Sequence, residues 1–382
     1  MKSKYVEIDI AEVSMNGKSP SGDLIEVLRT NDATFIVFVD GVGHGYMARI
    51  SAKFIISRIV SHLKQDITLR KVFYNELSRR ETHKENSKLH GYFTIIRIAE
   101  DGMSTILSYG MPKSLFVNPK YSTVLNFRNV KFGQIEVYEA SSYLEDGEGI
   151  IAFCDGISTA GIGTLYREGW GETRITAFIN ETLSSNAELS ELPYLIINKA
   201  KEIWNKKIGD DCTVAIARIR KCQNLNIFTG CPVDRNADTL VVKKFMEADG
   251  VHIVAGGSTA KLVSRELNEK LEVIADTSDL NVPVFYKIKG IDLVTEGVNT
   301  LNQLNNLLGQ PYEKYESDDP VFDFFEKIIK ADKINFFIGT AQNPANKSII
   351  FRQKGIESRS VIIPKLVSKL EILGKIVQVF EM

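Results

Sequence analysis

Two of the most apolar runs in the chain end in an aspartate that is followed at once by glycine. FIVFVDG carries the first of them at Asp40, and IIAFCDG carries the second at Asp155. Short apolar runs bounded by a turn residue are typical of buried strands. Each aspartate therefore leaves the core at the edge of a sheet, where the glycine allows the backbone to approach a ligand closely. The N-terminal half is thus limited to folds whose buried strands deliver acids to a sheet edge.

Two further acidic motifs lie in the same half. SGD places Asp23 after a turn of small residues, and GDDCT places Asp210 and Asp211 at the start of the apolar run CTVAIARIR. Like charges repel, and burying each carboxylate alone is costly, so several of them at one sheet edge require cations. Oxygen ligands without histidine or cysteine suit hard ions such as Mg²⁺ or Mn²⁺. Two such ions clamp a phosphoryl group and activate water, which is the chemistry of phosphate ester hydrolysis.

Each motif taken singly has an equally good structural explanation, because Asp-Gly is above all a turn dipeptide. The functional interpretation rests on four motifs in order, three of which adjoin apolar strands. Together SGDLIEV, FVDGVGHGYMA, YGMPKSLFV, IIAFCDGI and GDDCTVAIARI resemble the PPM family of metal-dependent protein phosphatases. Within that family they are most similar to the bacterial branch of stage II sporulation protein E.

The resemblance covers residues 1–220 and implies a fold of the α+β class. It is a sandwich of two antiparallel β-sheets flanked by helices, with two metal ions, Mn²⁺ or Mg²⁺, in a cleft at one end. The implied activity is hydrolysis of phosphoserine or phosphothreonine on a partner protein. The usual partners of this branch are anti-sigma-factor antagonists.

The resemblance also assigns metal ligands, residue by residue. Asp40 is the expected ligand that bridges both ions, and the Gly41 carbonyl is expected to bind one of them. Asp155 would bind the other ion. Asp210 is the expected last acidic ligand, with Asp211 as the alternate.

Four other residues near these motifs have weaker assignments. Asp23 would bind the metals or orient a metal-bound water, and Glu26 is a candidate to support it. His44 invites a general-acid role, although stabilisation of the GVGHG turn is the favoured interpretation. Lys18 precedes Asp23 where eukaryotic relatives carry a phosphate-binding arginine, and it is assigned no role.

The pattern changes after about Lys221, where helices and strands begin to alternate. Such alternation predicts a small α/β domain. KCQNLNIFTGCPVDRNAD breaks both patterns, so we place the boundary within residues 220–236. The expected division is a phosphatase domain over 1–220 and an α/β domain over 221–382, whose role the sequence leaves open between regulation and partner selection.

Within the second half, VHIVAGGSTAKLVSREL predicts a strand, a tight turn and a helix. Backbone N–H groups and hydroxyls over Gly256–Thr259 form a candidate anion site. The favoured interpretation is instead a helix N-capped by Ser258 or Thr259. The motif is neither a Walker A loop nor GxGxxG. Further on, Asp292 and Glu296 are expected in a solvated acidic loop.

Composition excludes several classes of protein. The formal net charge of -1 provides no general attraction to nucleic acid or anionic membranes. No apolar run is long enough to span a bilayer, and the first residues lack a signal core, so we expect a cytoplasmic protein. None of the four cysteines forms a CxxC pair, which argues against a zinc ribbon or a thioredoxin-like site. Cys154 and Cys212 are expected to be buried.

Two alternatives to a protein phosphatase stay open. One is a catalytically weak signalling scaffold with a phosphatase fold, whose C-terminal domain binds a partner or small ligand. The other is a phosphatase of small molecules. Non-catalytic relatives tend to lose a ligand, so the presence of Asp40, Asp155 and Asp210 favours an enzyme. The sequence does not indicate the oligomeric state or the choice between Mn²⁺ and Mg²⁺.

Overall fold

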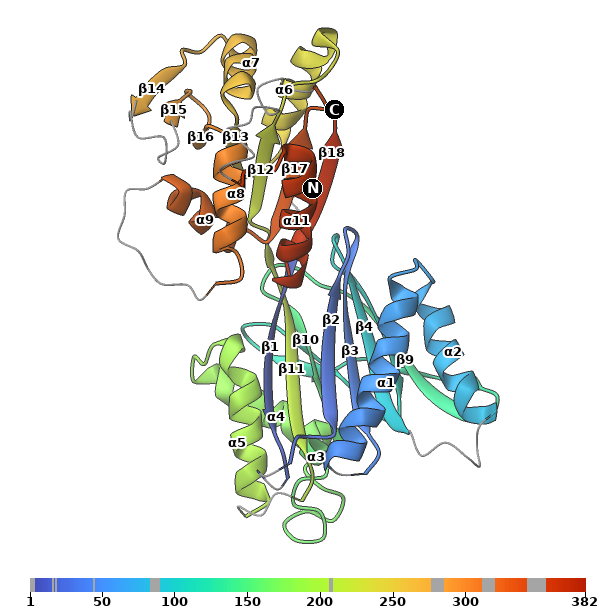
Figure 1. Cartoon of the computed structure of the whole chain (residues 1–382). Coiled ribbons are helices and arrows are strands. Elements are labelled where there is room, and N and C mark those ends of the chain that lie inside the picture. The colour runs from blue at the N-terminus through green and yellow to red at the C-terminus, as the bar shows by residue number, and fades with distance from the viewer. Residues whose placement is uncertain are drawn as a thin grey trace. The chain divides into compact units, whose positions relative to one another are not determined.

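A computed structural model describes residues 4–15, 17, 19–43, 45–82, 90–205, 209–275, 285–310, 320–341 and 355–382. The chain divides into two compact units, the first ending at Lys221 and the second running from Cys222 to Met382 (Figure 1). Among the helices described, none is long and apolar enough to cross a membrane.

The first unit contains two antiparallel sheets. One has the strand order β1-β11-β10-β6-β7, with bounds β1 Lys4–Val13, β11 Cys212–Lys221, β10 Gly149–Phe153, β6 Leu115–Val117 and β7 Ser122–Val124. The other has the order β2-β3-β4-β5-β9-β8, with bounds β2 Asp23–Arg29, β3 Ala33–Gly41, β4 Gly91–Ala99, β5 Met103–Tyr109, β9 Ile135–Tyr143 and β8 Arg128–Phe132. The helices are α1 Gly45–Leu63, α2 Leu69–Thr82, α3 Asp155–Ser158, α4 Gly171–Ser184 and α5 Leu192–Ile203, with a 3₁₀ turn η1 at Leu189–Glu191.

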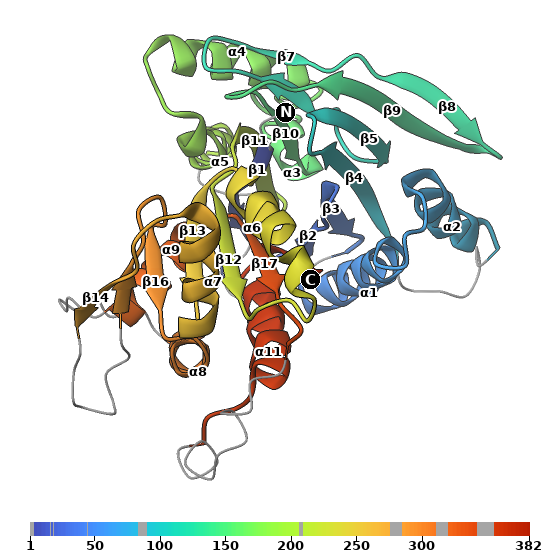
Figure 2. The ribbon, with the colours of Figure 1, turned by 90° about the horizontal axis from the view of Figure 1, so that it is seen from above.

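The two sheets pack face to face, and helices cover their outer faces. Because successive side chains of a strand point to opposite faces, Ile36 and Phe38 of β3 join the core between the sheets. Val37 and Val39 pack on the other face, against α1 and α2. Figure 2 shows α1 and α2 side by side on that outer face. The predicted sandwich of two antiparallel sheets flanked by helices is confirmed.

Strand β1 is an element that the sequence analysis did not predict. It pairs with β11 along its whole length, from Lys4 opposite Lys221 to Val13 opposite Cys212. β11 in turn pairs with β10, so the strands that precede Asp155 and follow Asp211 are neighbours in one sheet. This pairing brings two of the acidic motifs to the same end of the sandwich.

The second unit contains one mixed sheet with the order β14-β15-β16-β13-β12-β17-β18. Its strands are β12 Asn224–Thr229, β13 Val251–Ala255, β14 Glu272–Ala275, β15 Phe285–Lys287, β16 Leu293–Thr295, β17 Lys333–Ile338 and β18 Ile376–Glu381. Its helices are α6 Asp238–Glu247, α7 Gly257–Leu267, α8 Val298–Leu307, α9 Pro320–Lys330 and α11 Arg359–Ile372, with a 3₁₀ turn η2 at Arg235–Ala237. The strands from β16 to β18 are parallel, whereas β14 and β15 pair antiparallel at one side.

Helices cover both faces of this sheet. α6 and α7 pack with Phe228 and Val254 on one face. α8, α9 and α11 pack with Ile227 and Ile253 on the other. The smaller α/β architecture predicted for the C-terminal part agrees with this arrangement. The last helix, predicted around residues 366–374, begins earlier, at Arg359.

The sequence interpretation of residues 220–236 as a break in both patterns was wrong in one respect. These residues include β12, which lies in the middle of the second sheet. The apolar pattern is interrupted by Asn226, which is fully buried. Its amide donates to the carbonyl of Asp249 at 3.1 Å and accepts from Asn335 at 2.8 Å. A buried polar residue with satisfied hydrogen bonds is compatible with a central strand.

Candidate active site

The predicted acidic residues gather at one end of the first unit. Asp23 is the first residue of β2 and lies directly opposite Asp40 on β3. Asp155 is the first residue of α3 and follows β10, while Asp210 and Asp211 immediately precede β11. Because β10 pairs with β11, the last three acids come from adjacent strand ends.

The glycine of each Asp-Gly motif allows a close approach between backbones. A Cβ at Gly41 would overlap the carbonyl oxygen of Ala48 in α1. A Cβ at Gly156 would overlap the carbonyl oxygen of Asp211. Any larger residue would push these segments apart. The two glycines therefore allow the end of β3 to pack against α1 and the residues after β10 to pack against Asp211.

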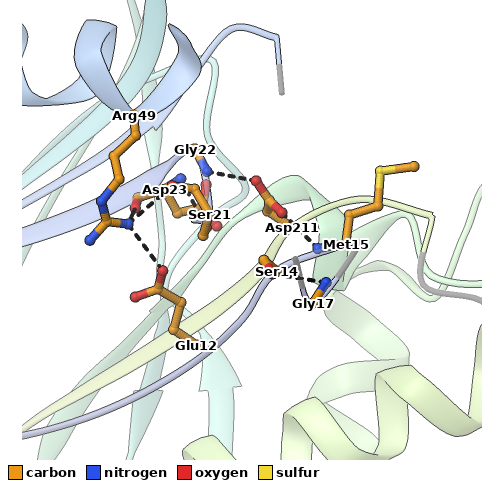
Figure 3. Close-up of polar contacts among 9 residues, drawn as sticks. All are labelled: Glu12, Ser14, Met15, Gly17, Ser21, Gly22, Asp23, Arg49 and Asp211. Atoms are coloured by element: carbon orange, nitrogen blue, oxygen red, sulfur yellow. Dashed lines mark hydrogen bonds and ion pairs between the residues drawn. The ribbon is translucent and has the colours of Figure 1, made fainter. Parts of the chain in front are cut away.

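Asp211 acts as an acceptor for the chain around Asp23. Its carboxylate accepts hydrogen bonds from the backbone N–H groups of Met15 at 2.8 Å and Gly22 at 2.6 Å, as Figure 3 shows. The residue is only 8% exposed. Both of its oxygens are thus used to tie the segment before β2 to the start of β11.

Arg49 of α1 also contributes to this corner, and the sequence analysis did not identify it. Its guanidinium donates to the carbonyl oxygens of Ser21 at 3.0 Å and Asp23 at 3.4 Å, and it pairs with Glu12 at 3.3 Å (Figure 3). These bonds hold the start of β2, and therefore Asp23, against α1. No feature of the sequence distinguishes Arg49 from an arginine whose side chain extends into solvent, because it is a single basic residue on a partly exposed helix.

Burial changes the protonation of the acids. Desolvation raises the pKa of Asp23 to about 7, and the charges of Asp211 and Asp155 add to the effect. Desolvation likewise raises the pKa of Asp40 to about 9, with further contributions from the neighbouring acids Asp23, Asp155 and Asp210. Asp155 has a raised pKa for the same first reason, and it shares a side-chain hydrogen bond with Asp40. The acids therefore hold protons where isolated carboxyl groups would be ionised.

The family described as stage II sporulation protein E (SpoIIE) matches residues 30–220, which is half of the chain. The chain belongs to the SpoIIE family. The matched range includes Asp40, Asp155, Asp210 and Asp211, and Asp23 lies before it.

Solved structures that resemble this SpoIIE-family chain include phosphatase domains. The phosphatase domain of SpoIIE from Bacillus subtilis has 17% sequence identity and a TM-score of 0.45, over 58% of this chain and 95% of that one. The RsbU and RsbW domains of a Mycobacterium tuberculosis protein have 13% identity and a TM-score of 0.47, over 64% and 69%. The PP2C domain of SiaA from Pseudomonas aeruginosa has 13% identity and a TM-score of 0.44, over 55% and 84%. Among curated proteins no relative matched the chain.

The donor set of this SpoIIE-family site fits hard cations in its chemistry. Oxygen donors dominate it, and Asp23 Oδ2 is buried without a hydrogen-bond partner. An orphaned buried carboxylate oxygen, together with neighbouring acids of raised pKa, is what bound cations would satisfy. Within the described residues, however, no three acidic, histidine or cysteine side chains are arranged to hold an ion as they stand. The carboxylates are gathered, but they do not form a closed coordination shell.

The remaining sequence candidates fall outside this cluster. Glu26 is exposed, and because side chains alternate along β2 it lies on the face opposite to Asp23. The structure therefore does not bring Glu26 to the acids. His44 and Lys18 lie outside the described residues.

Cys154 and Cys212 are fully buried beneath the acids, as predicted. The thiol of Cys154 donates to the carbonyl oxygen of Asp211 at 3.2 Å, and that of Cys212 to the carbonyl oxygen of Gly156 at 3.5 Å. Burial raises the pKa of both thiols. They are therefore neutral packing residues at neutral pH and do not act as thiolate ligands.

Proposed function

We propose that the first unit is a metal-dependent protein phosphatase that hydrolyses phosphoserine or phosphothreonine on a partner protein. The observation that supports this most directly is the gathering of Asp23, Asp40, Asp155 and Asp210 at one end of a SpoIIE-family sandwich. Four acids of separate motifs meet there, and three of them have raised pKa values. Such perturbed groups are typical of functional sites.

In this proposal two Mn²⁺ or Mg²⁺ ions would be held by Asp40, the Gly41 carbonyl, Asp155 and Asp210. When bound, the ions would generate a hydroxide nucleophile from water and neutralise charge on the phosphoryl group. Asp40 is the proposed shared ligand because it lies close to the other acids. The charges of Asp23, Asp155 and Asp210 all raise its pKa.

Asp23 is proposed to orient water or to bind a metal through its unpartnered oxygen. It is only 2% exposed, so it is held in place by packing, and Arg49 holds its backbone. A carboxylate with a raised pKa near neutrality is able to accept a proton from water and return it.

We assign the last ligand position to Asp210 and a structural role to Asp211. Asp211 already accepts two backbone N–H groups, from Met15 and Gly22. Withdrawing it for a metal would leave these two donors without an acceptor, and the Gly22 donor is buried. Asp210, which accepts a hydrogen bond from the N–H of Asp211 at 2.8 Å, is the ligand that the family pattern implies.

The proposed substrate is a phosphorylated protein, such as an anti-sigma-factor antagonist. A signalling partner is proposed because the chain belongs to the SpoIIE family, in which such antagonists are the usual partners. A small-molecule phosphatase and a non-catalytic scaffold are the competing functions. The presence of every expected acidic ligand favours an active phosphatase over the scaffold.

The deciding experiment is hydrolysis of a phosphoserine peptide by the whole chain, with Mn²⁺, with Mg²⁺ and with excess EDTA. We expect turnover that needs a divalent ion and is lost in EDTA. A sugar phosphate assayed in parallel separates the protein phosphatase from a small-molecule enzyme. Full activity after chelation would refute the metal mechanism, and no activity with any ion or substrate would favour the scaffold.

A further inference from the structure

The order of the parallel strands in the second unit indicates at which edge of the sheet a ligand would bind. Numbered along the chain, the strands β16, β13, β12, β17 and β18 lie in the order three, two, one, four, five. After β12 the chain passes to α6 on one face, and after β17 it passes to α11 on the other. Doubly wound sheets bind ligands outside the carboxyl ends of the strands, near the point where the order reverses.

Two helices start with glycine at this edge of the sheet. α7 follows β13 with Gly256 as its N-cap, and α8 follows β16 with Gly297 as its N-cap. Both glycines have a positive φ, 136° and 113°, which favours glycine. A Cβ at Gly297 would lie 2.8 Å from the Cα of Gly256, so the two helix starts touch. The predicted N-cap at Ser258 or Thr259 was wrong, because the helix already begins at Gly257.

A third helix begins at the same place. Asn302 of α8 accepts from the N–H of Glu357 at 3.0 Å and donates to its carbonyl at 3.0 Å. The same amide donates to the carbonyl of Val298 in the first turn of α8 at 2.8 Å. These bonds hold the start of α11, at Arg359, beside the start of α8. Two of the N-cap residues, Gly256 and Gly297, have no side chain to cap the helix, and the side chain of the third, Ser358, makes no capping hydrogen bond.

Arg359 supplies a positive charge to this group of helix starts. Its guanidinium rests on Gly230, where a Cβ would overlap it, and donates to the carbonyl of Ala341 at 2.8 Å. Gly230 N–H in turn donates to Thr259 Oγ1 at 2.8 Å, which links the loop after β12 to α7. Within the described residues no carboxylate pairs with Arg359, and burial lowers its pKa. A partly buried cation without a carboxylate partner is stabilised when an anion binds to it.

Two buried hydroxyls, one at the end of β16 and one in the first turn of α8, have no hydrogen-bond partner among the described residues. Thr295 and Thr300 are 0% exposed, and neither Oγ1 makes a hydrogen bond. Val294 packs with α6 and α7, so the alternation along β16 turns Thr295 to the opposite face, where α8 begins. Thr300 lies in the first turn of α8. Leaving a buried hydroxyl unpaired costs free energy, which a bound ligand or water would recover.

We propose that the second unit binds the phosphate group of a small phosphorylated molecule in this phosphate cradle, defined as Gly256–Thr259, Gly297–Thr300, Gly230 and Arg359. Three helix N-termini offer backbone donors and a favourable dipole field for an anion. Arg359 offers a charged donor, and Thr295 lies beneath the cradle. The acidic side chain of Glu296 is exposed to solvent at its edge.

The test is a calorimetric titration of inorganic phosphate into the whole chain after removal of metals with EDTA. Without cations the acidic site of the first unit repels phosphate, so saturable binding reports the second unit. We expect one site. Arg359→Gln should weaken it about tenfold or more, because a charged hydrogen bond to the anion is lost. Arg359→Lys, which keeps the charge, should lose less.

Thr295→Val distinguishes a ligand site from an unsatisfied structural hydroxyl. If the cradle uses the hydroxyl, phosphate affinity falls by about threefold to tenfold, while the thermal midpoint without phosphate is unchanged or higher. Lys289→Gln removes a charge in the turn that precedes β16, at the other end of the sheet, and should leave binding unchanged. Titration of a nucleoside monophosphate and of a sugar phosphate identifies the rest of the ligand.

Tighter binding of either compound than of phosphate would support the proposal and name the class of ligand. Equal affinities would support it with the phosphate group as the whole recognition element. The absence of saturable phosphate binding up to about 10 mM would overturn it. Binding that Arg359→Gln and Thr295→Val both leave unchanged would overturn it as well.

Discussion

Asp23 on β2 is the register partner of Asp40 on β3, so a buried and a partly buried carboxyl group lie opposite each other on neighbouring antiparallel strands. Like charges opposite each other destabilise such a pair. The charge of Asp23 raises the pKa of Asp40, as do those of Asp155 and Asp210. This arrangement is unfavourable without a cation or a proton, and five expected outcomes follow from it and from the fold around it.

Asp40→Asn should reduce turnover of a phosphoserine peptide by about a thousandfold or more, because the proposed shared ligand is lost. The metal-free variant should unfold at the same or a higher urea concentration, because Asp40 must either take up a proton or stay charged among other acids on folding, and asparagine does neither. Steady-state kinetics with Mn²⁺ and urea unfolding in EDTA measure the two effects. Asp146→Asn, at an exposed position, is the matched control. Near-native turnover of Asp40→Asn would show that this residue is no ligand.

Asp211→Asn and Asp210→Asn should have opposite signatures. The first replaces an oxygen that accepts N–H from Met15 or Gly22 by an amide that cannot accept, and should lower the free energy of unfolding by about 1–3 kcal/mol. The second should mainly weaken binding of Mn²⁺. Urea unfolding in EDTA and Mn²⁺ titration of both variants make the comparison. The reverse pattern would make Asp211 the ligand.

Binding of Mn²⁺ should release protons and become tighter as pH rises. Burial raises the pKa of Asp23 to about 7 and of Asp40 to about 9, so at neutral pH the metal-free site holds protons that compete with the ion. Raising the pH removes this competitor, and the apparent affinity should increase from about pH 6 to about pH 9. Calorimetry at pH 7 in buffers of different ionisation enthalpy should show release of about one to two protons, since Asp23 is about half protonated and Asp40 almost fully protonated at that pH. An affinity that is constant over this range would contradict the expected protonation.

The native protein should be alkylated first at Cys231. Cys154 and Cys212 are fully buried, and burial raises the pKa of their thiols, so little thiolate is available at pH 8. Cys222 is also buried, whereas Cys231 is partly exposed. Iodoacetamide labelling followed by peptide mass spectrometry gives the order, with Cys231→Ala as the control. Equal labelling of Cys154 in the native protein would mean that the acidic end of the sandwich opens readily.

A chain that ends after Lys221 should fold and keep Mn²⁺-dependent hydrolysis of a small phosphate ester. Lys221 is the last residue of β11 and pairs with Lys4, so the cut preserves the full β1–β11 pairing. Every proposed ligand lies before it. Circular dichroism and ester hydrolysis test the prediction. A product without secondary structure, or a folded one without activity, would show that residues after 221 complete the core or the site.

Local patterns predicted much of what was found. FIVFVD predicted β3, and the hairpin around Asp101-Gly102 is present as β4 and β5. The four-residue spacing of Ile55, Ile59 and Leu63 predicted the buried side of α1. These elements are readable because their apolar periodicity matches a single type of secondary structure.

Other elements were missed because their sequences are ambiguous on their own. β1 has polar residues such as Glu7 and Asp9, and these pair with Arg218 of the adjacent β11. Strand β12 contains Asn226, whose buried amide is satisfied only by residues distant in sequence. In both cases the partner that makes the strand favourable comes from elsewhere in the chain, so no local pattern reveals it.

The sequence by itself determined which acidic residues are available, the buried strands that lead to Asp40 and Asp155, and the change of architecture near residue 221. The tertiary structure alone decided that Asp23 lies opposite Asp40, that Asp211 accepts hydrogen bonds from Met15 and Gly22, and that the starts of α7 and α8 touch at Gly256 and Gly297. Composition and periodicity report each residue's local preference. Register, burial and the sharing of hydrogen-bond donors depend on which distant segments pack together, and that is settled only by the free energy of the whole fold.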